Sequence, residues 1–480
     1  MIKRWKEKYS QVPLTVKVST AYAVCSILQK CLSFITLPLF TRLLTTEQYG
    51  QYTIYSSWSG ILTIFLTLNL AYGSFQTAMA KFEGRRDEYI TSIQGICVVL
   101  CCVFLAVYLP LRNVWNRLFE LPTPFVLLMV AEIIFSTATQ LWMEKNRFEF
   151  KYKSVVLVTL LTSVLSPVIA FILVSLVSEK GYARIFGYAI VNILIGFILF
   201  VYNSQKGKRF YNKEFWKYAA GFNIPLLVYY LSQVVFNQSD RIMISHMAGT
   251  SDAAMYGVAY NLAMFLTFVL NAINASYVPW IYEKIKDNKS SENQTISLML
   301  AILMGLMILC VIWYAPEIIV IMAGEQYKAA IYVVAPVAMS LFLLLYCQFF
   351  INVEFYYEEK KMLIYGSIGA AILNIILNYI LIPVYGFVAA GYTTLVSYIV
   401  FTLSNYYTMQ LCLKKRQLID NLYNYKGLFL IFVGFIVSGF LGVALYENLV
   451  FRIAITLAVL GLLIVYRNKF LGALKQIRGK

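Results

Sequence analysis

The sequence carries little charge and almost no histidine. Charged residues make up 13% of its 480 residues, whereas 60% are hydrophobic and the mean hydropathy is +0.70. So few charges could not keep that much apolar surface in water, which excludes a soluble domain. His246 is the only histidine, and one histidine without nearby acids makes neither a catalytic base nor a metal site.

Cysteine is present, but without the spacing of a metal site or a disulfide framework. The eight cysteines lie in or beside apolar runs: Cys25, Cys31, Cys97, Cys101, Cys102, Cys310, Cys347 and Cys412. Thiols so placed predict packing roles, and we expect no metal and no cofactor. The basic start is followed by a long apolar stretch without a small-residue cleavage site, so we expect this stretch to be retained.

Long apolar runs dominate the chain. Runs of about twenty apolar residues match the length that a helix needs to cross a bilayer of ~30 Å. They should be helices, because lipid satisfies no backbone hydrogen bond. We count fourteen candidate spans, from Thr15–Leu39 and Tyr49–Ala80 to Leu449–Tyr466, with no loop long enough for a separate domain. The predicted fold class is an all-α integral membrane protein.

The net charge of +17 comes from basic clusters between the apolar runs. If the fourteen spans alternate in direction, most Lys and Arg residues fall on one side. Eight fall on the other: Arg42, Arg112, Arg117, Lys180, Arg184, Arg241, Lys328 and Arg452. This positive-inside bias predicts that both termini are cytoplasmic, and we expect no nucleic-acid partner.

Two pairs of short matches indicate an internal repeat. Tyr49-Gly50 matches Tyr256-Gly257, and Gly181 with Gly187 matches Gly386 with Gly391. The offsets of about 206 residues correspond to six spans, so the two halves would be parallel repeats. Chance matching of Gly and Tyr is the alternative. The repeat predicts an N-terminal lobe (1–205), a C-terminal lobe (206–415) and two added helices with the tail (416–480).

Charges at membrane depth are the informative positions, because each costs about 2.5 to 3.5 kcal/mol to insert. Lys30 is a candidate contact for a phosphate or pyrophosphate in a cavity; the alternative is an ion pair with Glu132. Asp240 and Arg241 point about 100° apart on one helix. Arg241 is either an anion contact or an anchor at the outer end of its helix. Asp240 and Glu132 are candidates for coupling to protons or sodium ions, with structural pairing as the alternative.

Polar side chains recur at helical spacing on three predicted spans. Amide, hydroxyl and aromatic groups of this kind bind sugars, so the stripes predict a cavity for a polyhydroxylated cargo. Hydrogen bonding between helices is the alternative for any single one. The candidate cavity residues are Tyr229, Gln233, Asn237, Asn271, Asn274, Asn374 and Asn378.

Three segments resemble one known family of membrane proteins. They are Leu37–Leu44 followed by Glu47–Gly50, Asp240-Arg241 followed by Met255–Gly257, and Leu377–Tyr392. All three are similar to the polysaccharide repeat-unit flippases of the multidrug/oligosaccharidyl-lipid/polysaccharide (MOP) exporter superfamily. The last of these segments resembles the motif that joins helices eleven and twelve.

The resemblance implies a fold and a cargo. It implies two six-helix lobes around a central aqueous cavity, alternating access, and an undecaprenyl-pyrophosphate-linked glycan as substrate. Cavities of such flippases are cationic, which agrees with Lys30, whereas Arg42 and Arg241 lie toward the outer rim. Fourteen spans also resemble the lipid II flippases, in which the extra helix pair lies beside the bundle. Drug exporters of the superfamily usually stop at twelve.

We therefore expect a multi-pass flippase of the bacterial cytoplasmic (inner) membrane, and not an enzyme. It would act as a monomer on a lipid-linked oligosaccharide, beside the polymerase and glycosyltransferases of its pathway. The alternatives are a lipid II flippase or a multidrug antiporter. A membrane glycosyltransferase or polymerase would need acidic or histidine residues in a sizeable outer loop, and this chain has only short loops.

Overall fold

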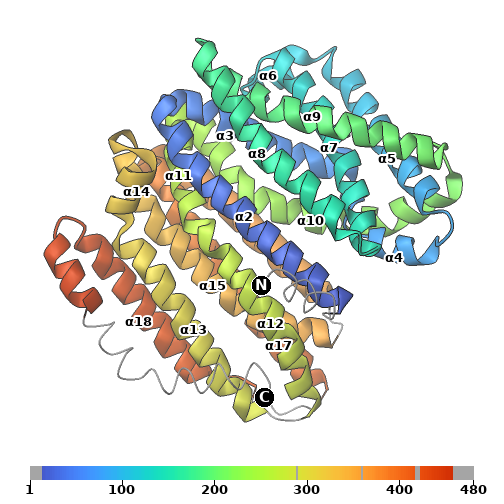
Figure 1. The fold of residues 1–480 in the computed structure, drawn as a ribbon. Coiled ribbons are helices and arrows are strands. Elements are labelled where there is room, and N and C mark those ends of the chain that lie inside the picture. The colour runs from blue at the N-terminus through green and yellow to red at the C-terminus, as the bar shows by residue number, and fades with distance from the viewer. Residues whose placement is uncertain (1–12, 288–289, 358–359, 417–421, 458–480) are drawn as a thin grey trace, which may run out of the picture. The chain divides into compact units, whose positions relative to one another are not determined.

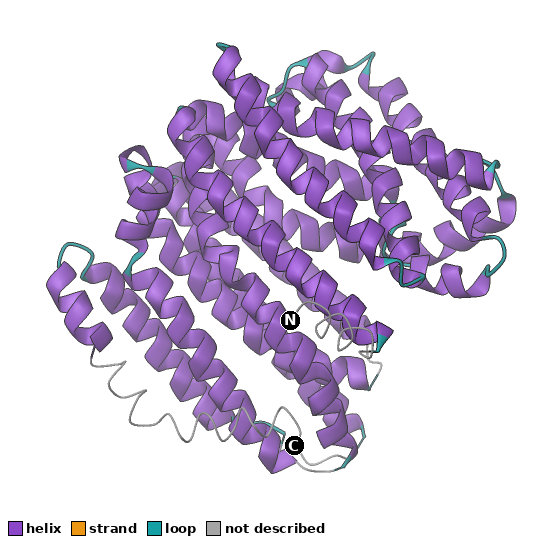
Figure 2. Cartoon of the chain, in the orientation of Figure 1, coloured by secondary structure: helices purple, strands orange, loops and turns teal. Residues whose placement is uncertain are grey.

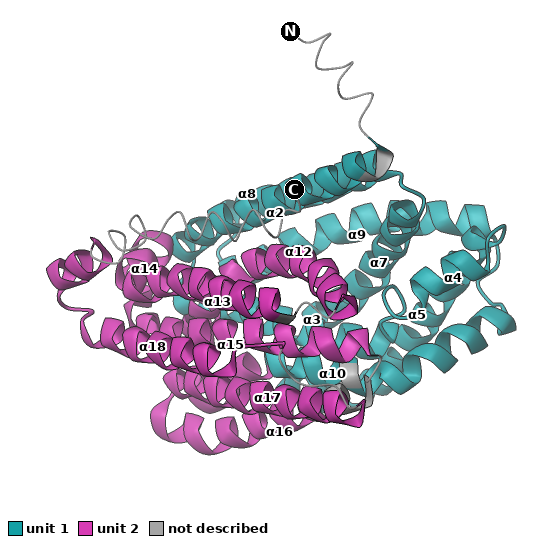
Figure 3. Ribbon diagram, turned by 90° about the horizontal axis from the view of Figure 1, so that it is seen from below, with its two compact units in different colours: residues 1–238 teal, residues 239–480 magenta. Residues whose placement is uncertain are grey.

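The computed structural model describes residues 13–287, 290–357, 360–416 and 422–457. Every regular element in these ranges is a helix (Figure 2), so the prediction of an all-α fold is confirmed. Compactness divides the chain into two units, residues 1–238 (unit 1) and 239–480 (unit 2), which have separate colours in Figure 3. The predicted grouping into 1–205, 206–415 and 416–480 stays a prediction.

Unit 1 is built around α9, which packs against α3, α5, α7 and α8, while α2 packs along α8 (Figure 1). The helices of this unit are α2 (Leu14–Leu43), α3 (Thr46–Thr67), α4 (Phe75–Lys81), α5 (Arg86–Tyr108), α6 (Arg112–Phe119), α7 (Thr123–Phe148), α8 (Tyr152–Leu176), α9 (Lys180–Gly207) and α10 (Lys213–Ala248), whose last turns belong to unit 2.

Unit 2 is built around α15, which is almost wholly buried and packs against α11, α13 and α17. The helices of this unit are α11 (Thr250–Ala263), η1 (Met264–Leu266), α12 (Thr267–Lys286), α13 (Ser290–Trp313), α14 (Ala315–Ala323), η2 (Glu325–Ala330), α15 (Ile331–Tyr356), α16 (Lys360–Tyr385), α17 (Phe387–Lys415) and α18 (Tyr425–Ala444).

Most helices have the length and composition of membrane spans. Within the described ranges, eleven helices qualify, and α10 is a twelfth that bends by 47° between Val228 and Tyr230. Pro225 lies inside α10 and removes one backbone hydrogen bond, which is a common cause of such a bend. α3 has 22 residues, enough to span, and the last predicted span, Leu449–Tyr466, lies mostly outside the described residues. The helices therefore agree with the predicted number of about fourteen.

One predicted span is wrong in its extent. The stretch Tyr49–Ala80 forms two helices, α3 and α4, rather than one. α3 begins at a capping box in which Thr45 and Gln48 bind each other's backbone N–H groups at 3.2 Å. It ends where Leu68 and Asn69 take φ angles of 49° and 53°, since a left-handed residue cannot continue a right-handed helix. Apolar composition alone did not reveal this break.

Two of the glycines in the predicted repeat lie where helices approach closely. In unit 1, a Cβ on Gly187 of α9 would lie 2.4 Å from the Cα of Ala170 in α8. In unit 2, a Cβ on Gly391 of α17 would lie 2.9 Å from the Cγ of Pro336 in α15. Small residues let membrane helices pack backbone to backbone, so α8 and α9 are held close together at Gly187.

Candidate functional site

Lys30 lies near the middle of α2, and its side chain is exposed. It forms no ion pair with Glu132 in the part of the chain that the structure describes. The carboxylate of Glu132 instead accepts hydrogen bonds from the Tyr55 hydroxyl at 2.7 Å and from Asn192 Nδ2 at 2.8 Å. The alternative of a Lys30–Glu132 ion pair is therefore wrong, because the carboxylate is bound within α3, α7 and α9.

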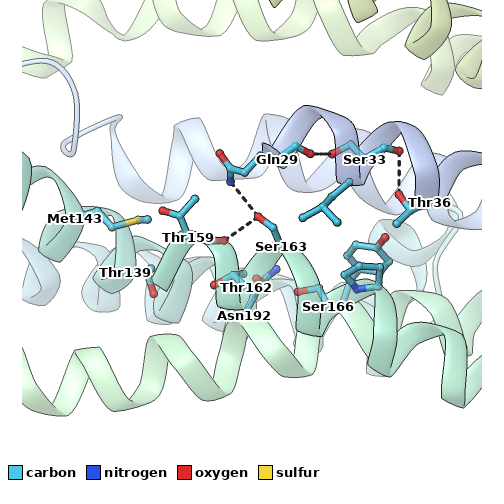
Figure 4. A pocket seen from close by; sticks show the side chains of 13 residues that line it. Gln29, Ser33, Thr36, Thr139, Met143, Thr159, Thr162, Ser163, Ser166 and Asn192 are labelled. Carbon is cyan, nitrogen blue, oxygen red and sulfur yellow. Dashed lines mark hydrogen bonds between the residues drawn. The ribbon is translucent and has the colours of Figure 1, made fainter. Parts of the chain in front are cut away.

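A polar pocket of about 310 Å³ opens in unit 1 between α2, α7, α8 and α9. Figure 4 shows its side chains converging on one space. Ten of the thirteen lining residues carry a hydroxyl or an amide group, and none is charged. The lining residues are Gln29, Leu32, Ser33, Thr36, Thr139, Met143, Thr159, Thr162, Ser163, Ser166, Pro167, Tyr188 and Asn192.

The hydroxyl groups of the pocket mostly donate to their own helices. Ser163 donates to the carbonyl of Thr159, and Thr162 donates to that of Val158, both at 2.8 Å. On α2, Ser33 donates to the carbonyl of Gln29 at 3.0 Å, as Figure 4 shows. This bonding satisfies the hydroxyl proton and leaves the oxygen lone pairs directed elsewhere. The result is a wall of hydrogen-bond acceptors.

Two contacts hold the walls of the pocket in place. Gln29 Nε2 donates to Ser163 Oγ at 3.1 Å and so joins α2 to α8 (Figure 4). Asn192, on α9, donates to Glu132 on α7. The side chain of Glu132 is half-buried. The two donors that its carboxylate binds stabilise its negative charge.

A buried arginine lies next to the pocket on α9. Arg184 is 5% exposed, and its guanidinium carbon lies 4.5 Å from the ring centre of Phe40, 4.4 Å from Tyr49 and 3.8 Å from Tyr52. The ring of Tyr188, a pocket residue, lies 6.0 Å away. Aromatic faces stabilise a cation at these distances, and more so away from water. From the sequence, Arg184 was assigned only to the outer basic residues. Its spacing of four residues from Tyr188 places both side chains on one face of a helix, which could have indicated the contact.

Asp240 lies in a closed hydrogen-bond network in unit 2. Its carboxylate accepts hydrogen bonds from Tyr256 Oη (2.5 Å), Thr394 Oγ1 (2.9 Å) and Asn378 Nδ2 (2.6 Å). Asn378 also donates to Asn374 at 3.2 Å and accepts a hydrogen bond from Thr393. These side chains are at most 2% exposed, so the network is dry and its members bind each other.

The other predicted site residues are spread over the two units. Arg241 is buried, with its guanidinium carbon 4.4 Å from the ring centre of Tyr260, whereas Arg42 is exposed. Asn274 accepts a hydrogen bond from Asn352 at 2.8 Å, and Asn271 is exposed.

On α10, Asn237 donates to the carbonyl of Gln233 at 2.7 Å, and both side chains are half-buried. The side chain of Tyr229 lies outside the described residues. The structure therefore brings Asp240, Asn374 and Asn378 together and leaves the other candidates outside that network.

Comparison with known proteins gives the same family as the sequence motifs. The family described as polysaccharide biosynthesis protein matches residues 16–285, more than half of the chain. A protein of the Lsg locus of Haemophilus influenzae is 23% identical over 379 residues, which cover 75% of this chain and 89% of that protein.

Two solved structures have a similar fold. The lipid II flippase MurJ, in an inward closed conformation, has a TM-score of 0.67 at 13% identity; the likeness covers 93% of this chain and 99% of MurJ. A multidrug resistance MATE family transporter of the MOP superfamily, facing inward, has a TM-score of 0.58 at 14% identity over 80% of this chain and 96% of its own. The chain therefore belongs to the polysaccharide biosynthesis protein family.

Proposed function

We propose that this protein is a flippase that moves polyprenyl-pyrophosphate-linked oligosaccharides across the bacterial cytoplasmic membrane. The observation that carries the proposal is the polar pocket of unit 1, which lies among helices that are otherwise apolar. Gln29 and Ser163 lie near the middle of their helices, where polar groups are costly unless they bind something. A polar head group in transit needs such a compartment, while its lipid chain can stay in the bilayer.

Lys30 is the proposed contact for the pyrophosphate. Its exposed ammonium lies three residues from Ser33, a pocket residue, and so about one helical turn from the pocket wall. A flexible ammonium can follow a phosphate while the surrounding helices move. Arg42 and Arg241 are proposed as further anion contacts. In this mechanism the two lobes alternate between states open to either side, and both termini stay in the cytoplasm.

Asp240 and Glu132 are the proposed coupling residues. The carboxylate of Asp240 accepts from the hydroxyl of Thr394 and the amide nitrogen of Asn378, and carboxylate and hydroxyl oxygens are groups that bind a hard monovalent cation. The carboxylate can also bind a proton. Glu132 is bound to Asn192 and so is connected to the pocket. A proton or a sodium ion would drive the cycle by changing the charge at one of these carboxylates.

The fold likeness to a lipid II flippase favours one second candidate, transport of lipid II. Reconstitution in liposomes separates the candidates. The purified protein would be tested with a polyprenyl-pyrophosphate oligosaccharide, with lipid II and with a cationic dye, and the glycans would be detected at the outer face with a membrane-impermeant enzyme. We expect the oligosaccharide lipid to be flipped and Lys30→Ala to reduce its flipping at least tenfold.

Several outcomes would contradict this proposal. Flipping of lipid II alone would assign the second candidate, and uptake of dye alone would assign a drug antiporter. Normal flipping by a well-folded Lys30→Ala variant would reject the role of Lys30. Lengthening of the glycan by the isolated protein would mean an enzyme, and we expect none. The polymerase and glycosyltransferases of the same pathway are the proposed partners of a monomeric flippase.

A further inference from the structure

The pocket of unit 1 differs from an anion site in its hydrogen-bond chemistry. Among its lining residues five hydroxyl groups donate to carbonyl groups of their own helices: Ser33, Thr36, Thr139, Thr162 and Ser163. Each of these oxygens can then only accept a hydrogen bond from a ligand. A phosphate or a carboxylate also only accepts, so these groups offer it nothing.

A proline interrupts the backbone hydrogen bonds of α8 beside the same wall. Pro167 lies inside α8 and lines the pocket. Because proline has no N–H, the carbonyl group of Ser163 lacks its usual donor four residues later in the helix. Ser163 therefore offers the pocket a hydroxyl oxygen that already accepts from Gln29, at a turn of helix where one backbone hydrogen bond is missing. A ligand with several O–H or N–H donors fits this wall.

The charges behind the wall do not favour an anion either. The carboxylate of Glu132 adjoins the pocket lining, because it binds the pocket residue Asn192 directly. The positive charge of Arg184 is surrounded by Phe40, Tyr49 and Tyr52, and it does not line the pocket. The pocket therefore presents uncharged groups to its ligand.

The size and one wall of the pocket indicate a single ring. About 310 Å³ lies at the lower end of the range of roughly 300 to 1,000 Å³ that holds small ligands, which suits one sugar better than a whole oligosaccharide. Tyr188 supplies an aromatic ring at the wall, and such rings combine an apolar face with a polar tip. The side-chain amides of Gln29 and Asn192 line the same space.

We infer that the pocket between α2, α7, α8 and α9 is a binding subsite for one uncharged sugar of the cargo, held mainly through its hydroxyl or N-acetyl donors. This inference rests on the proposed function and deepens it, because it separates the sugar subsite from the contact for the pyrophosphate. Ser163 and Thr162 of α8 are then specificity-determining residues that accept from the sugar, and Gln29 fixes Ser163.

Binding of small probes to the purified full-length protein in lipid nanodiscs tests the inference. The probes are methyl glucoside, methyl N-acetylglucosaminide, methyl glucuronide and inorganic pyrophosphate, followed by saturation-transfer nuclear magnetic resonance. The test variant combines Ser163→Ala with Thr162→Val, which removes two acceptors and keeps the volume nearly unchanged. Ser175→Ala is the matched control, because Ser175 donates to its own helix on α8 at 2.9 Å but does not line the pocket.

We expect at least one neutral glycoside to bind the wild type and the Ser175→Ala control equally, and the double variant at least tenfold more weakly. Binding of pyrophosphate should not change in the double variant. The inference is overturned if no neutral glycoside binds, if the double variant binds like the wild type, or if the substitutions weaken only the glucuronide or pyrophosphate. Unchanged thermal unfolding of the double variant shows that its fold is intact.

Flipping by the same variants separates this inference from the proposed function. If the wild type flips the oligosaccharide lipid and the double variant flips it equally well, the sugar subsite is wrong and the flippase stands. If the wild type flips no lipid-linked substrate although the glycoside binds in the pocket, the flippase is wrong and the sugar subsite stands.

Discussion

The Asp240 network of unit 2 and the pocket of unit 1 both gather polar side chains, but they use them in opposite ways. Around Asp240 in unit 2, hydroxyl and amide donors converge on one carboxylate, and all of these side chains are at most 2% exposed. In the pocket of unit 1, hydroxyl groups donate to their own helices and leave their oxygens facing a volume of about 310 Å³. The first arrangement holds helices together, and the second leaves capacity for a ligand.

Two of the buried arginines, Arg452 in unit 2 and Arg184 in unit 1, repeat this contrast. Arg452 in unit 2 binds both carboxylate oxygens of Glu317, at 2.7 and 2.8 Å, and the carbonyl of Trp313 at 2.6 Å. Arg184 in unit 1 lies among aromatic rings. Arg452 thus binds polar partners within unit 2, as Asp240 does, so changes at these two residues should cost stability. Changes in the unit 1 pocket should mainly affect binding.

The largest effect is expected from Asp240→Ala. The substitution leaves Tyr256, Thr394 and Asn378 without their shared acceptor in a dry interior, and each buried donor left unsatisfied costs about 1–3 kcal/mol. Thermal unfolding of the purified protein in detergent measures the loss. Glu132→Ala is the control, because that carboxylate is half-buried and has two donors. An equal loss in both variants would contradict the contrast.

An added methyl group should destabilise the protein more at Gly187 in unit 1 than at Gly391 in unit 2. Gly187→Ala places a Cβ 2.4 Å from the backbone of Ala170, so α8 and α9 must separate, at a cost of about 1–3 kcal/mol. Gly391→Ala meets a ring carbon of Pro336 at 2.9 Å and should cost less. Gly434→Ala, with open space around it, is the control. Thermal unfolding ranks the three variants, and a loss for Gly391→Ala as large as for Gly187→Ala would be evidence against the proposed order.

A matched pair of isosteric substitutions compares the two kinds of hydroxyl directly. Thr394→Val removes a donor to Asp240 and should cost about 1–3 kcal/mol, because a buried charge loses a partner. Thr162→Val removes a hydroxyl that is bonded only to a helix carbonyl, which keeps its backbone donor, so unfolding should hardly change. Flipping should instead fall in Thr162→Val. Loss of stability in Thr162→Val would show that the pocket wall is structural.

The polar residues of the Asp240 network in unit 2 were easier to identify from the sequence than those of the pocket in unit 1. Asp240, Asn374 and Asn378 interrupt long apolar runs, and a carboxylate or amide at membrane depth requires a partner. Their helical spacing placed Asn374 and Asn378 on one face of α16. It could not tell whether that face meets a cavity or other side chains, because this depends on the helices packed against it.

The pocket of unit 1 left almost no signal in the sequence. Thr162, Ser163 and Ser166 lie in an apolar run, and a single Ser or Thr in a membrane helix commonly bonds its own backbone. Only the packing of four helices brings these residues together with Gln29. The fold was more predictable, because apolar runs report span length directly. The break of Tyr49–Ala80 was missed because it is a local backbone conformation.

The smallest effect should be a pH dependence that distinguishes the two arginines. Arg452 donates to Glu317 and thereby lowers the pKa of Glu317 below its ordinary value of 4.5. The folded state thus holds this proton less tightly than the unfolded chain, so the pair stabilises the fold above about pH 4.5 and loses that contribution as the pH falls. The carboxylate is partly exposed, and solvent screening keeps the effect small. Glu317→Gln should lower the unfolding midpoint at pH 7 and make less difference at pH 4.

Arg184→Leu is the comparison variant, for which we expect no pH dependence. Its contacts are with aromatic rings rather than a carboxylate, so the change in midpoint that it causes should be the same at pH 7 and pH 4. If the effect of Glu317→Gln did not shrink at low pH, the ion pair would not be the source of stability at that end of unit 2. If the effect of Arg184→Leu did shrink, the carboxylate of Glu132, which binds Tyr55 on the same helix as Tyr52, would be its source, and the contrast between the two units would lose one of its supports.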